Sequence, residues 1–363
     1  MSVFVAQLFP KDKVKDIKGA SQAGINFCHG FIDAIQPDTV YAYQINSEGK
    51  KLQLDFQNKR IEYICFRGFP HKSIFKALNV VIENITIVRE IIRKKENNIW
   101  FYNLTPQVIL AFIILKILLR KKCFILVADF TPELFRNKIA LKLMKLSNGV
   151  ISLTPELKKL IGNGIPVLVK AGIIDESHIV TKTNTEVIRN KFLFSGSLSK
   201  YTGIELALDV FAQLPEMELF ISGTGQSIDV IKEYCEKYPN IHYCGYLDFK
   251  EYLSLLDSVD FVLSLRDISL GKNNYNFPSK IVEYLINKKI VISTKQYETL
   301  DNDIYFYCDY ELTDLKEKVL FVNHLPNDKI NLIRDDAQKF AMNSFSKRSW
   351  KEKVHEIENI GKI

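Results

Sequence analysis

Several widespread site motifs are missing from the 363-residue sequence. There is no CxxC pair and no HExxH motif, so neither common kind of zinc site is indicated. There is no GxxxxGK[ST] motif, which excludes a P-loop nucleotide site. With 16 Gly and 11 Pro, the composition also excludes collagen-like and low-complexity proteins.

Long hydrophobic runs are missing too. The longest one, Val108–Leu119, is interrupted by Lys116 and is shorter than the ~20 residues that span a bilayer. The first eight residues have no basic region and no signal-peptide cleavage site. The six cysteines lie mostly in hydrophobic runs, as is typical of buried thiols in a reducing compartment. We expect a cytoplasmic protein, with peripheral contact at the inner leaflet of the plasma membrane as an open alternative.

The excess of positive charge is small. The chain has 49 Lys and Arg against 42 Asp and Glu, a formal net charge of +7. Because nucleic-acid binding needs a concentrated basic face, we expect no nucleic-acid partner. The densest basic groups, Arg93–Lys95 and Arg120–Lys122, each follow a hydrophobic helical pattern. They fit either solvated helix ends that favour the helix dipole or a patch that contacts anionic lipid.

What is present is an α/β pattern. Short β-branched or aromatic runs alternate with helical patterns, once before and once after a polar segment at 175–190. This pattern predicts two similar α/β domains with parallel sheets, the first over residues 1–180 and the second over 190–344. Expected strands are 3–8, 39–44, 62–67, 98–102, 123–128, 149–153, 191–195, 217–222, 241–244, 260–264 and 290–293. Expected helices are 22–35, 74–95, 106–120, 138–146, 155–161, 204–213, 228–238, 249–256, 279–287 and 335–360, the last with Phe345, Trp350, Val354 and Ile357 as packing residues.

The segment Asn276–Leu285 carries the clearest ligand pattern. Pro278 suits the first position of a helix, so Ser279 and Lys280 would stand beside free backbone N–H groups that bind an anion. Glu283 lies one helical turn after Ser279, within reach of a sugar hydroxyl. The alternative is an ordinary amphipathic helix with an incidental Lys–Glu face.

Three glycine-containing loops are further candidates. Gly196 would let a ligand approach the backbone after a predicted strand, and Lys200 could reach its phosphate. Gly223 and Gly225 lack the third glycine of GxGxxG, so a loop shaped around a nucleotide base fits better than a nicotinamide site. Gly19 lies in a small-residue loop that could admit a pyrophosphate at a helix start. A plain turn or surface loop is the alternative for each.

Acidic residues give two more candidates. Asp129 follows the strand expected at 123–128, where a carboxylate could contact a hydroxyl or a cationic transition state, or cap the next helix. Asp301 and Asp303 could hold a divalent metal, but their polar surroundings favour a solvated loop. We therefore predict no metal site.

In order and spacing, three segments resemble the donor-binding domain of the retaining GT-B glycosyltransferases of family 4, which build bacterial polysaccharides and lipid-linked glycans. These segments are Phe194–Leu198, Ile221–Gly225, and Phe277–Leu285 followed by Lys289–Thr294. Lys18–Ser21 and Val150–Leu157 resemble the family's first domain more loosely. The resemblance implies two Rossmann-like α/β domains facing a central cleft, with a C-terminal helix at 345–363 crossing back to the acceptor-side first domain.

The resemblance also implies roles for individual residues. Glu283 would hold the donor ribose, and Asn274 and Asn276 would contact the donor sugar. Two positions depart from the family pattern: Tyr275 stands where a first glutamate is common, and Thr202 stands where a phosphate-loop lysine is common. The diphosphate would be bound by Gly19, Gly196, Lys200, Ser279 and Lys280, the nucleoside by Gly223, Gly225, Tyr246 and Glu283, and catalysis would involve Asp129, Lys280 and Glu283.

The implied activity is that of a retaining hexosyltransferase-type enzyme that needs no metal and no cofactor. It would move a sugar from a nucleoside-diphosphate sugar, with UDP or GDP as the expected nucleotide, to a hydroxyl of a growing glycan, a lipid-linked one being favoured. Three alternatives stay open. They are a sugar-nucleotide epimerase or hydrolase on the same fold, a non-catalytic nucleotide-sugar-binding subunit of a glycan assembly complex, and a basic membrane- or nucleic-acid-binding protein.

Overall fold

The structure is a computed structural model and describes residues 2–9, 22–44, 53–56, 59–65, 73–128, 130, 132, 134–174, 179, 186–270, 273, 275, 277 and 279–360. The chain divides into two compact units. Unit 1 comprises Met1–Ile173, Tyr275–Phe277 and Lys347–Ile363, and unit 2 comprises Ile174–Asn274 and Pro278–Ser346.

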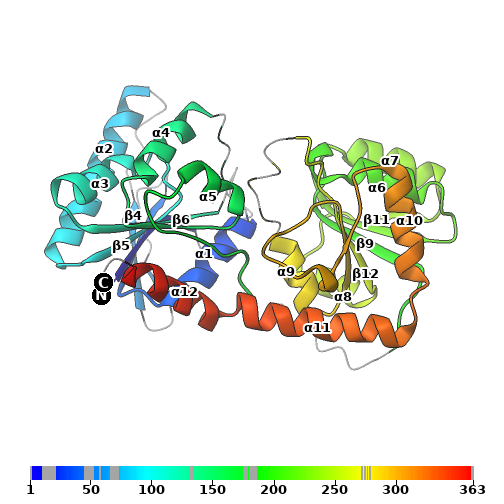
Figure 1. Ribbon diagram of the computed structural model, residues 1–363. Helices are drawn as coiled ribbons and strands as arrows, with labels where there is room; N and C mark the ends of the chain where they lie inside the picture. The colour runs from blue at the N-terminus through cyan, green and yellow to red at the C-terminus, as the bar shows by residue number, and fades with distance from the viewer. Residues whose placement is uncertain are drawn as a thin grey trace. The chain divides into compact units, whose positions relative to one another are not determined.

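Unit 1 is built on an eight-stranded sheet with the order β3-β4-β2-β1-β5-β6-β7-β8 (Figure 1). Its strands are β1 (Ser2–Gln7), β2 (Thr39–Gln44), β3 (Gln53–Phe56), β4 (Lys59–Cys65), β5 (Asn98–Tyr102), β6 (Lys122–Val127), β7 (Gly149–Ser152) and β8 (Val167–Val169). The pairings are parallel except that of β3 with β4. The sequence pattern predicts parallel sheets and no strand at β3. The two-residue connection from β3 to β4 permits only an antiparallel pair.

Helices cover both faces of this sheet. Val3 and Val5 belong to one buried cluster and Phe4 to the other, because successive strand residues point to opposite faces. The first cluster is covered by α2 (Ser73–Arg93), α3 (Ile109–Ile113), the π-helical turn η2 (Ile114–Leu118), α4 (Phe135–Met144) and α5 (Pro155–Ile161). The second is covered by α1 (Gln22–Ile35) and α12 (Lys347–Asn359), which lie side by side (Figure 1).

The C-terminal helix packs on unit 1, as expected from the sequence. The Trp350 indole is fully buried, meets Phe31 edge-on at 5.5 Å between ring centroids, and donates its N–H to the Gly172 carbonyl at 2.6 Å. Val354 and Ile357 are buried beside it. The single helix expected over 335–360 is instead two, α11 (Asn327–Phe345) and α12, because Ser346 has an extended backbone that breaks the run.

Unit 2 is built on a six-stranded parallel sheet with the order β11-β10-β9-β12-β13-β14. The chain runs outward from the centre first through β9, β10 and β11, and then through β12, β13 and β14, so the order reverses between β9 and β12. The strands are β9 (Lys191–Ser197), β10 (Glu218–Thr224), β11 (Ile241–Tyr243), β12 (Phe261–Ser264), β13 (Ile290–Ser293) and β14 (Phe306–Tyr307). The helices are η4 (Lys200–Thr202), α6 (Ile204–Phe211), α7 (Ile228–Lys237), α8 (Phe249–Asp257), α9 (Ser279–Ile286), η6 (Asn302–Ile304), α10 (Leu312–Asn323) and α11.

Two sequence-based expectations concern thiols and membranes. The described cysteine side chains are free thiols: Cys28, Cys123 and Cys308 are buried, and Cys235 and Cys244 are partly buried. Within the described ranges, none of the helices has the length and apolar character needed to cross a bilayer.

Candidate functional site

The candidate site lies at the carboxyl edge of the unit 2 sheet (Figure 1). In open parallel sheets, ligands bind outside the carboxyl ends of strands where the strand order reverses, which here is between β9 and β12. The ends of β9 and β10 pair in register, with Gly196 opposite Gly223. Because α9 follows β12, its amino end at Ser279 belongs to the same edge.

The glycines at this edge serve two different purposes. A Cβ on Gly223, whose φ is +137°, would lie 1.9 Å from the Gly196 carbonyl oxygen, and a Cβ on Gly225 would lie 1.9 Å from the Leu198 carbonyl oxygen. Both positions therefore exclude a side chain because neighbouring backbone approaches too closely. At Gly196, whose φ is +129°, a Cβ would meet nothing within 4 Å. Gly196 thus faces open space where a ligand can approach the backbone.

The loop after β9 is held by Thr202. Its Oγ1 lies 2.7 Å from the carbonyl oxygens of Ser197 and Ser199 and accepts a hydrogen bond from the Ser199 N–H at 3.2 Å. Lys200 is exposed on this loop, with Nζ 5.6 Å from the centre of the Tyr201 ring. Thr202 therefore braces the loop that presents Lys200, and it supplies no charge of its own.

Glu283 is the best-positioned carboxylate of the candidate site. Its Oε2 accepts a hydrogen bond from the Tyr252 hydroxyl of α8 at 2.7 Å and lies 3.1 Å from Lys280 Nζ. The same Nζ lies 3.5 Å from the centre of the Tyr252 ring. The Glu283 side chain is only 12% exposed, whereas that of Lys280 is 34% exposed. This Tyr252–Lys280–Glu283 group combines a fixed acceptor with a cation that solvent or a ligand can reach.

Electrostatics keep Tyr252 in its donating form. Burial, followed by the negative charge of Glu283, raises the pKa of Tyr252 well above its ordinary value of 10.0. The phenol therefore stays protonated near neutral pH and donates to Glu283 throughout that range.

Polar contacts hold Asn273, a described residue between β12 and α9. The Asn273 side-chain amide donates to the Tyr201 carbonyl at 2.9 Å and to the Asp267 carbonyl at 2.8 Å. Lys295 Nζ donates to the Asn273 carbonyl at 2.6 Å. Ser195 Oγ and Tyr284 Oη lie 3.2 Å apart and connect β9 to α9. These contacts join the loop after β9 to Asn273, and β9 itself to α9.

Sequence reasoning missed Tyr252 and Asn273. A helix containing Tyr252 was predicted, but no local pattern indicates that it packs beside α9. Asn273 gave no signal, since a buried amide that holds three backbone segments together resembles any loop asparagine in the sequence.

The loop after β11 borders the same edge. The Gly223 N–H donates to the Gly245 carbonyl at 2.9 Å, and the Tyr243 hydroxyl donates to the Gly223 carbonyl at 2.9 Å. Tyr246 follows, with its side chain exposed. The structure thus brings together Gly223 and the Gly245–Tyr246 turn, which the sequence analysis assigned to nucleoside binding.

Four predicted site residues, Gly19, Asp129, Asn274 and Asn276, lie outside the described residues. Between the last two, the Tyr275 ring packs against Phe130 with 6.4 Å between ring centroids and adjoins the apolar cluster of unit 1. Asp301 and Asp303 are exposed around η6. In the part of the chain that the structure describes, no three His, Cys, Asp or Glu side chains form a group that could hold a metal ion.

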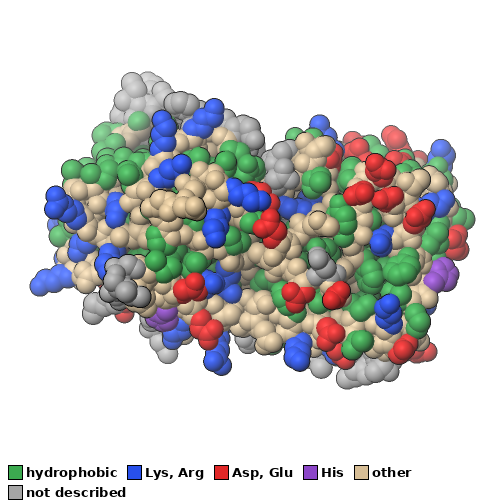
Figure 2. Space-filling model, in the orientation of Figure 1, with side chains coloured by type: hydrophobic (Ala, Val, Ile, Leu, Met, Phe, Trp, Pro, Cys, Tyr) green, Lys and Arg blue, Asp and Glu red, His purple; other side chains and the backbone are tan. Residues whose placement is uncertain are grey.

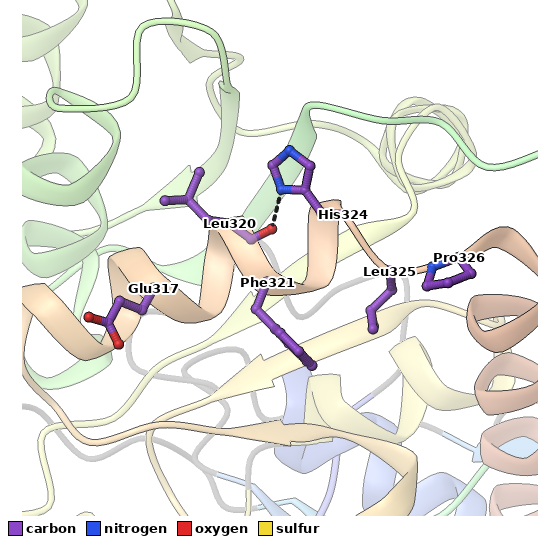
Figure 3. A pocket seen from close by; sticks show the side chains of 6 residues that line it. All are labelled: Glu317, Leu320, Phe321, His324, Leu325 and Pro326. Atoms are coloured by element: carbon purple, nitrogen blue, oxygen red, sulfur yellow. Dashed lines mark hydrogen bonds between the residues drawn. The ribbon is translucent and has the colours of Figure 1, made fainter.

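A cavity of about 550 Å³ lies elsewhere in unit 2, at the end of α10 (Figure 3). Its lining is mainly apolar, and His324 Nδ1 is turned back to the Leu320 carbonyl at 2.7 Å. The residues that line the cavity include no Lys or Arg to bind a diphosphate, so we place the candidate site at the carboxyl edge of the sheet and not here. The lining residues are Glu317, Leu320, Phe321, His324, Leu325 and Pro326.

One family model matches part of the chain. Residues 176–302 match the family model described as "Glycosyl transferases group 1", a segment that contains β9 to α9. No curated protein matches the chain.

Solved structures match nearly the whole chain. The N-terminal domain of Candida albicans trehalose-6-phosphate phosphatase is 12% identical with a TM-score of 0.75, and the match covers 99% of this chain and 97% of that one. Anabaena HepE, solved in complex with UDP-glucose, is 13% identical with a TM-score of 0.72, and the match covers 99% of this chain and 100% of that one. A glycosyltransferase from Rickettsia africae is 15% identical with a TM-score of 0.69, and the match covers 99% of this chain and 98% of that one.

The chain has the GT-B fold. At these identities the likeness establishes the architecture, and the α/β class with two sheet-based units expected from the sequence is confirmed.

Proposed function

We propose that the protein is a glycosyltransferase that moves a sugar from a nucleoside-diphosphate sugar, with UDP or GDP as the nucleotide, to a hydroxyl of a growing glycan. The observation that carries the proposal is the Tyr252–Lys280–Glu283 group at the start of α9, within the segment that matches the family model. The bound UDP-glucose of the similar Anabaena protein supports a nucleotide-sugar ligand.

The nucleoside would be held through its ribose. Glu283 is nearly buried and held by Tyr252, so it can accept a hydrogen bond from a ribose hydroxyl with little reorganisation. Gly223 and the Gly245–Tyr246 turn would border the base.

The diphosphate would be held by Lys280, Ser279, Lys200 and the backbone of Gly196. Lys280 is paired with Glu283 at 3.1 Å, and in the complex it would turn to the diphosphate oxygens. Negative charge develops on this group as the sugar leaves, so a cation already in place lowers the barrier. Because Lys280, Lys200 and the amino end of α9 supply this positive charge, the proposed reaction uses no metal and no cofactor.

The proposal extends to a hexosyl transfer with retention of configuration, as in family 4, within bacterial polysaccharide or glycan synthesis, and to a lipid-linked acceptor. In it Asn274, Asn276 and Asp129 contact the transferred sugar, and Gly19 adds a backbone contact to the diphosphate.

The test is donor turnover. The protein is incubated with UDP- and GDP-hexoses in EDTA, with and without glycan acceptors, and nucleoside diphosphate and products are quantified by chromatography and NMR. We expect acceptor-dependent release of one nucleoside diphosphate and an α-linked product from an α-linked donor. Interconversion of donor sugars without acceptor would show an epimerase instead, and equal release with and without acceptor would show a hydrolase.

A second candidate, a non-catalytic nucleotide-sugar-binding subunit, is favoured by Tyr275. This residue stands where the family often has a glutamate, and its ring packs among apolar side chains. Tight donor binding without turnover in any acceptor panel would support this candidate over the enzyme.

A further inference from the structure

The outer face of α2 is apolar where a surface helix is normally polar. Its inner side is buried through residues such as Ile87 and Ile91. The opposite side carries large aliphatic side chains that are 39–53% exposed and spaced to form one stripe along the helix. These are Leu78, Val81, Ile82, Ile85 and Ile92. A surface helix that carries a stripe of large aliphatic side chains on its outer face normally has something covering that face.

The end of η2 adds a second exposed aliphatic group. Ile117, Leu118 and Leu119 are exposed in sequence, and Leu118 is 70% exposed. The ends of α2 and η2 lie together, since Lys121 Nζ donates to the Glu96 carbonyl at 2.9 Å and β5 and β6 begin side by side, with Asn98 opposite Lys122. The two aliphatic groups therefore belong to one side of unit 1.

Positive charge surrounds these groups. Residues 73–161 contain 15 Lys and Arg against 6 Asp and Glu, a formal charge of +9, whereas the whole chain carries +7. Of the four acids in this segment whose side chains are described, Glu83 and Glu96 are buried and Glu90 is paired with Arg93 at 2.6 Å. The exposed cations include Arg89, Arg93, Lys95, Arg120 and Lys122 on α2 and after η2, and Lys138, Lys142 and Lys145 on or just after α4.

Figure 2 shows green and blue side chains gathered over α2, α3 and α4, whereas red side chains gather over unit 2. Solvated helix ends explain the cations, because positive charge is favourable at a helix C-terminus. They do not explain eight exposed Leu, Ile and Val side chains beside them.

We propose that this α2–η2 face, formed by the eight aliphatic side chains and the cations Arg89, Arg93, Lys95, Arg120 and Lys122, docks onto an anionic lipid bilayer. Aliphatic side chains enter the headgroup–acyl boundary while Lys and Arg contact the anionic headgroups, a combination that suits a lipid surface. The complementarity of charge selects lipid over a second copy of the chain, because two such faces would repel each other.

This inference goes beyond the proposed function. It concerns unit 1, whereas the Tyr252–Lys280–Glu283 group belongs to unit 2. Vesicle binding needs neither donor nor acceptor, so the docking and the transferase activity can fail independently.

The test is co-sedimentation of the full chain with vesicles, either of pure phosphatidylcholine or of about three parts phosphatidylcholine to one part phosphatidylglycerol. We expect binding to the anionic vesicles that weakens as salt is raised, and little binding to the neutral ones. Reversing two charges, R120E with K122E, should lower the partition coefficient at least ~25-fold, since each cation contributes about fivefold. Replacing two exposed aliphatic side chains, I85S with L118S, should lower it by about tenfold or more.

Matched controls come from unit 2. L332S replaces a comparably exposed leucine on α11, and K232E with K329E reverses two exposed lysines. Both controls should bind vesicles as the unaltered chain does. All replaced side chains are exposed, and circular dichroism of each variant verifies its folding.

Absence of binding to anionic vesicles would overturn the proposal. An equal loss of vesicle binding in the α2–η2 face variants and in the control variants would also overturn it. Sedimentation without lipid tests whether a second copy of the chain covers this face instead. A dimer of the unaltered chain that L118S converts to a monomer would make the face a protein interface, and this result would also overturn the proposal.

Discussion

The Tyr252 hydroxyl on α8 donates to Glu283 Oε2 on α9 at 2.7 Å, and the Lys280 ammonium lies both beside that oxygen and over the tyrosine ring. One tyrosine thus positions the carboxylate through its hydroxyl and the cation through its ring. If Glu283 holds the ribose and Lys280 holds the diphosphate, Tyr252 keeps both of these side chains in position.

Replacing Tyr252 by Phe tests this relationship. The ring under Lys280 stays, but Glu283 loses a hydrogen bond, and we expect nucleoside-diphosphate affinity to fall about tenfold, since hydrogen bonds to charged groups contribute ~1.5–3 kcal/mol. Isothermal titration measures the change. Tyr234→Phe is the control. Tyr234 on α7 donates the same kind of hydrogen bond, from its hydroxyl to the Asp209 carboxylate at 2.5 Å, but lies outside the candidate site. An equal loss of affinity in both variants would contradict a specific role for Tyr252.

Replacing Lys280 by Ala should weaken diphosphate binding more strongly. Loss of a charge-assisted contact to the diphosphate predicts a decrease of at least about tenfold, with a smaller effect on nucleoside without phosphate. Lys288→Ala is a close control: Lys288 follows the same helix, is 36% exposed and pairs with Asp335 at 2.7 Å. Unchanged affinity in Lys280→Ala would remove this residue from the diphosphate site.

The pH dependence of stability should carry a contribution from Glu83. Burial on the inner side of α2 raises the pKa of its carboxyl from 4.5 to about 8. The folded chain therefore holds this proton more tightly than the unfolded chain. The stabilisation is full below pH 4.5 and is lost as pH rises through 8.

Glu83→Gln should remove this dependence. Between pH 5 and pH 8, urea unfolding should show the free energy of the unaltered chain falling by a few kcal/mol more than that of the variant. Glu90→Gln, on the same helix but only partly buried, is the control. The same slope in the unaltered chain and Glu83→Gln would show that Glu83 is ionised when folded.

Glycines at the site edge should differ in tolerance. Gly223→Ala places a Cβ 1.9 Å from the Gly196 carbonyl oxygen, so we expect loss of more than ~4 kcal/mol or failure to fold. Gly245→Ala also has a positive φ, +74°, but meets nothing within 4 Å and should cost only about 1–2 kcal/mol. Thermal denaturation compares them, and equal melting temperatures would contradict the close approach of the two strand ends.

Local sequence patterns predicted most elements of both units. The ranges 39–44, 98–102 and 290–293 are strands with those bounds, and α1 and α5 have the predicted bounds, because alternation, apolar spacing and helix caps are local features. The strands β3, β8 and β14, the helix α10 and the break at Ser346 were missed. The three strands are only four, three and two residues long, α10 has weak apolar periodicity, and no residue near Ser346 is a typical helix breaker.

The candidate site was predictable only in part. Ser279, Lys280 and Glu283 share a motif, so their spacing on one helix could be deduced. The contact from Tyr252 joins residues 31 positions apart on two helices, and which helices pack together depends on the whole sheet order. Gly223 and Gly225 were assigned to the nucleoside, but the sequence could not show that backbone packing alone already requires glycine there.

The most direct test is to measure the melting temperature of the protein with UDP, GDP, CDP, ADP or TDP, once in EDTA and once in Mg²⁺. We expect UDP or GDP to raise the melting temperature equally in EDTA and in Mg²⁺, corresponding to a stabilisation of ~2.7 kcal/mol at a nucleotide concentration of about 100 Kd. A shift that needs Mg²⁺ would contradict binding by Lys280 and the α9 amino end alone. No shift with any nucleotide would contradict the nucleotide-sugar site itself.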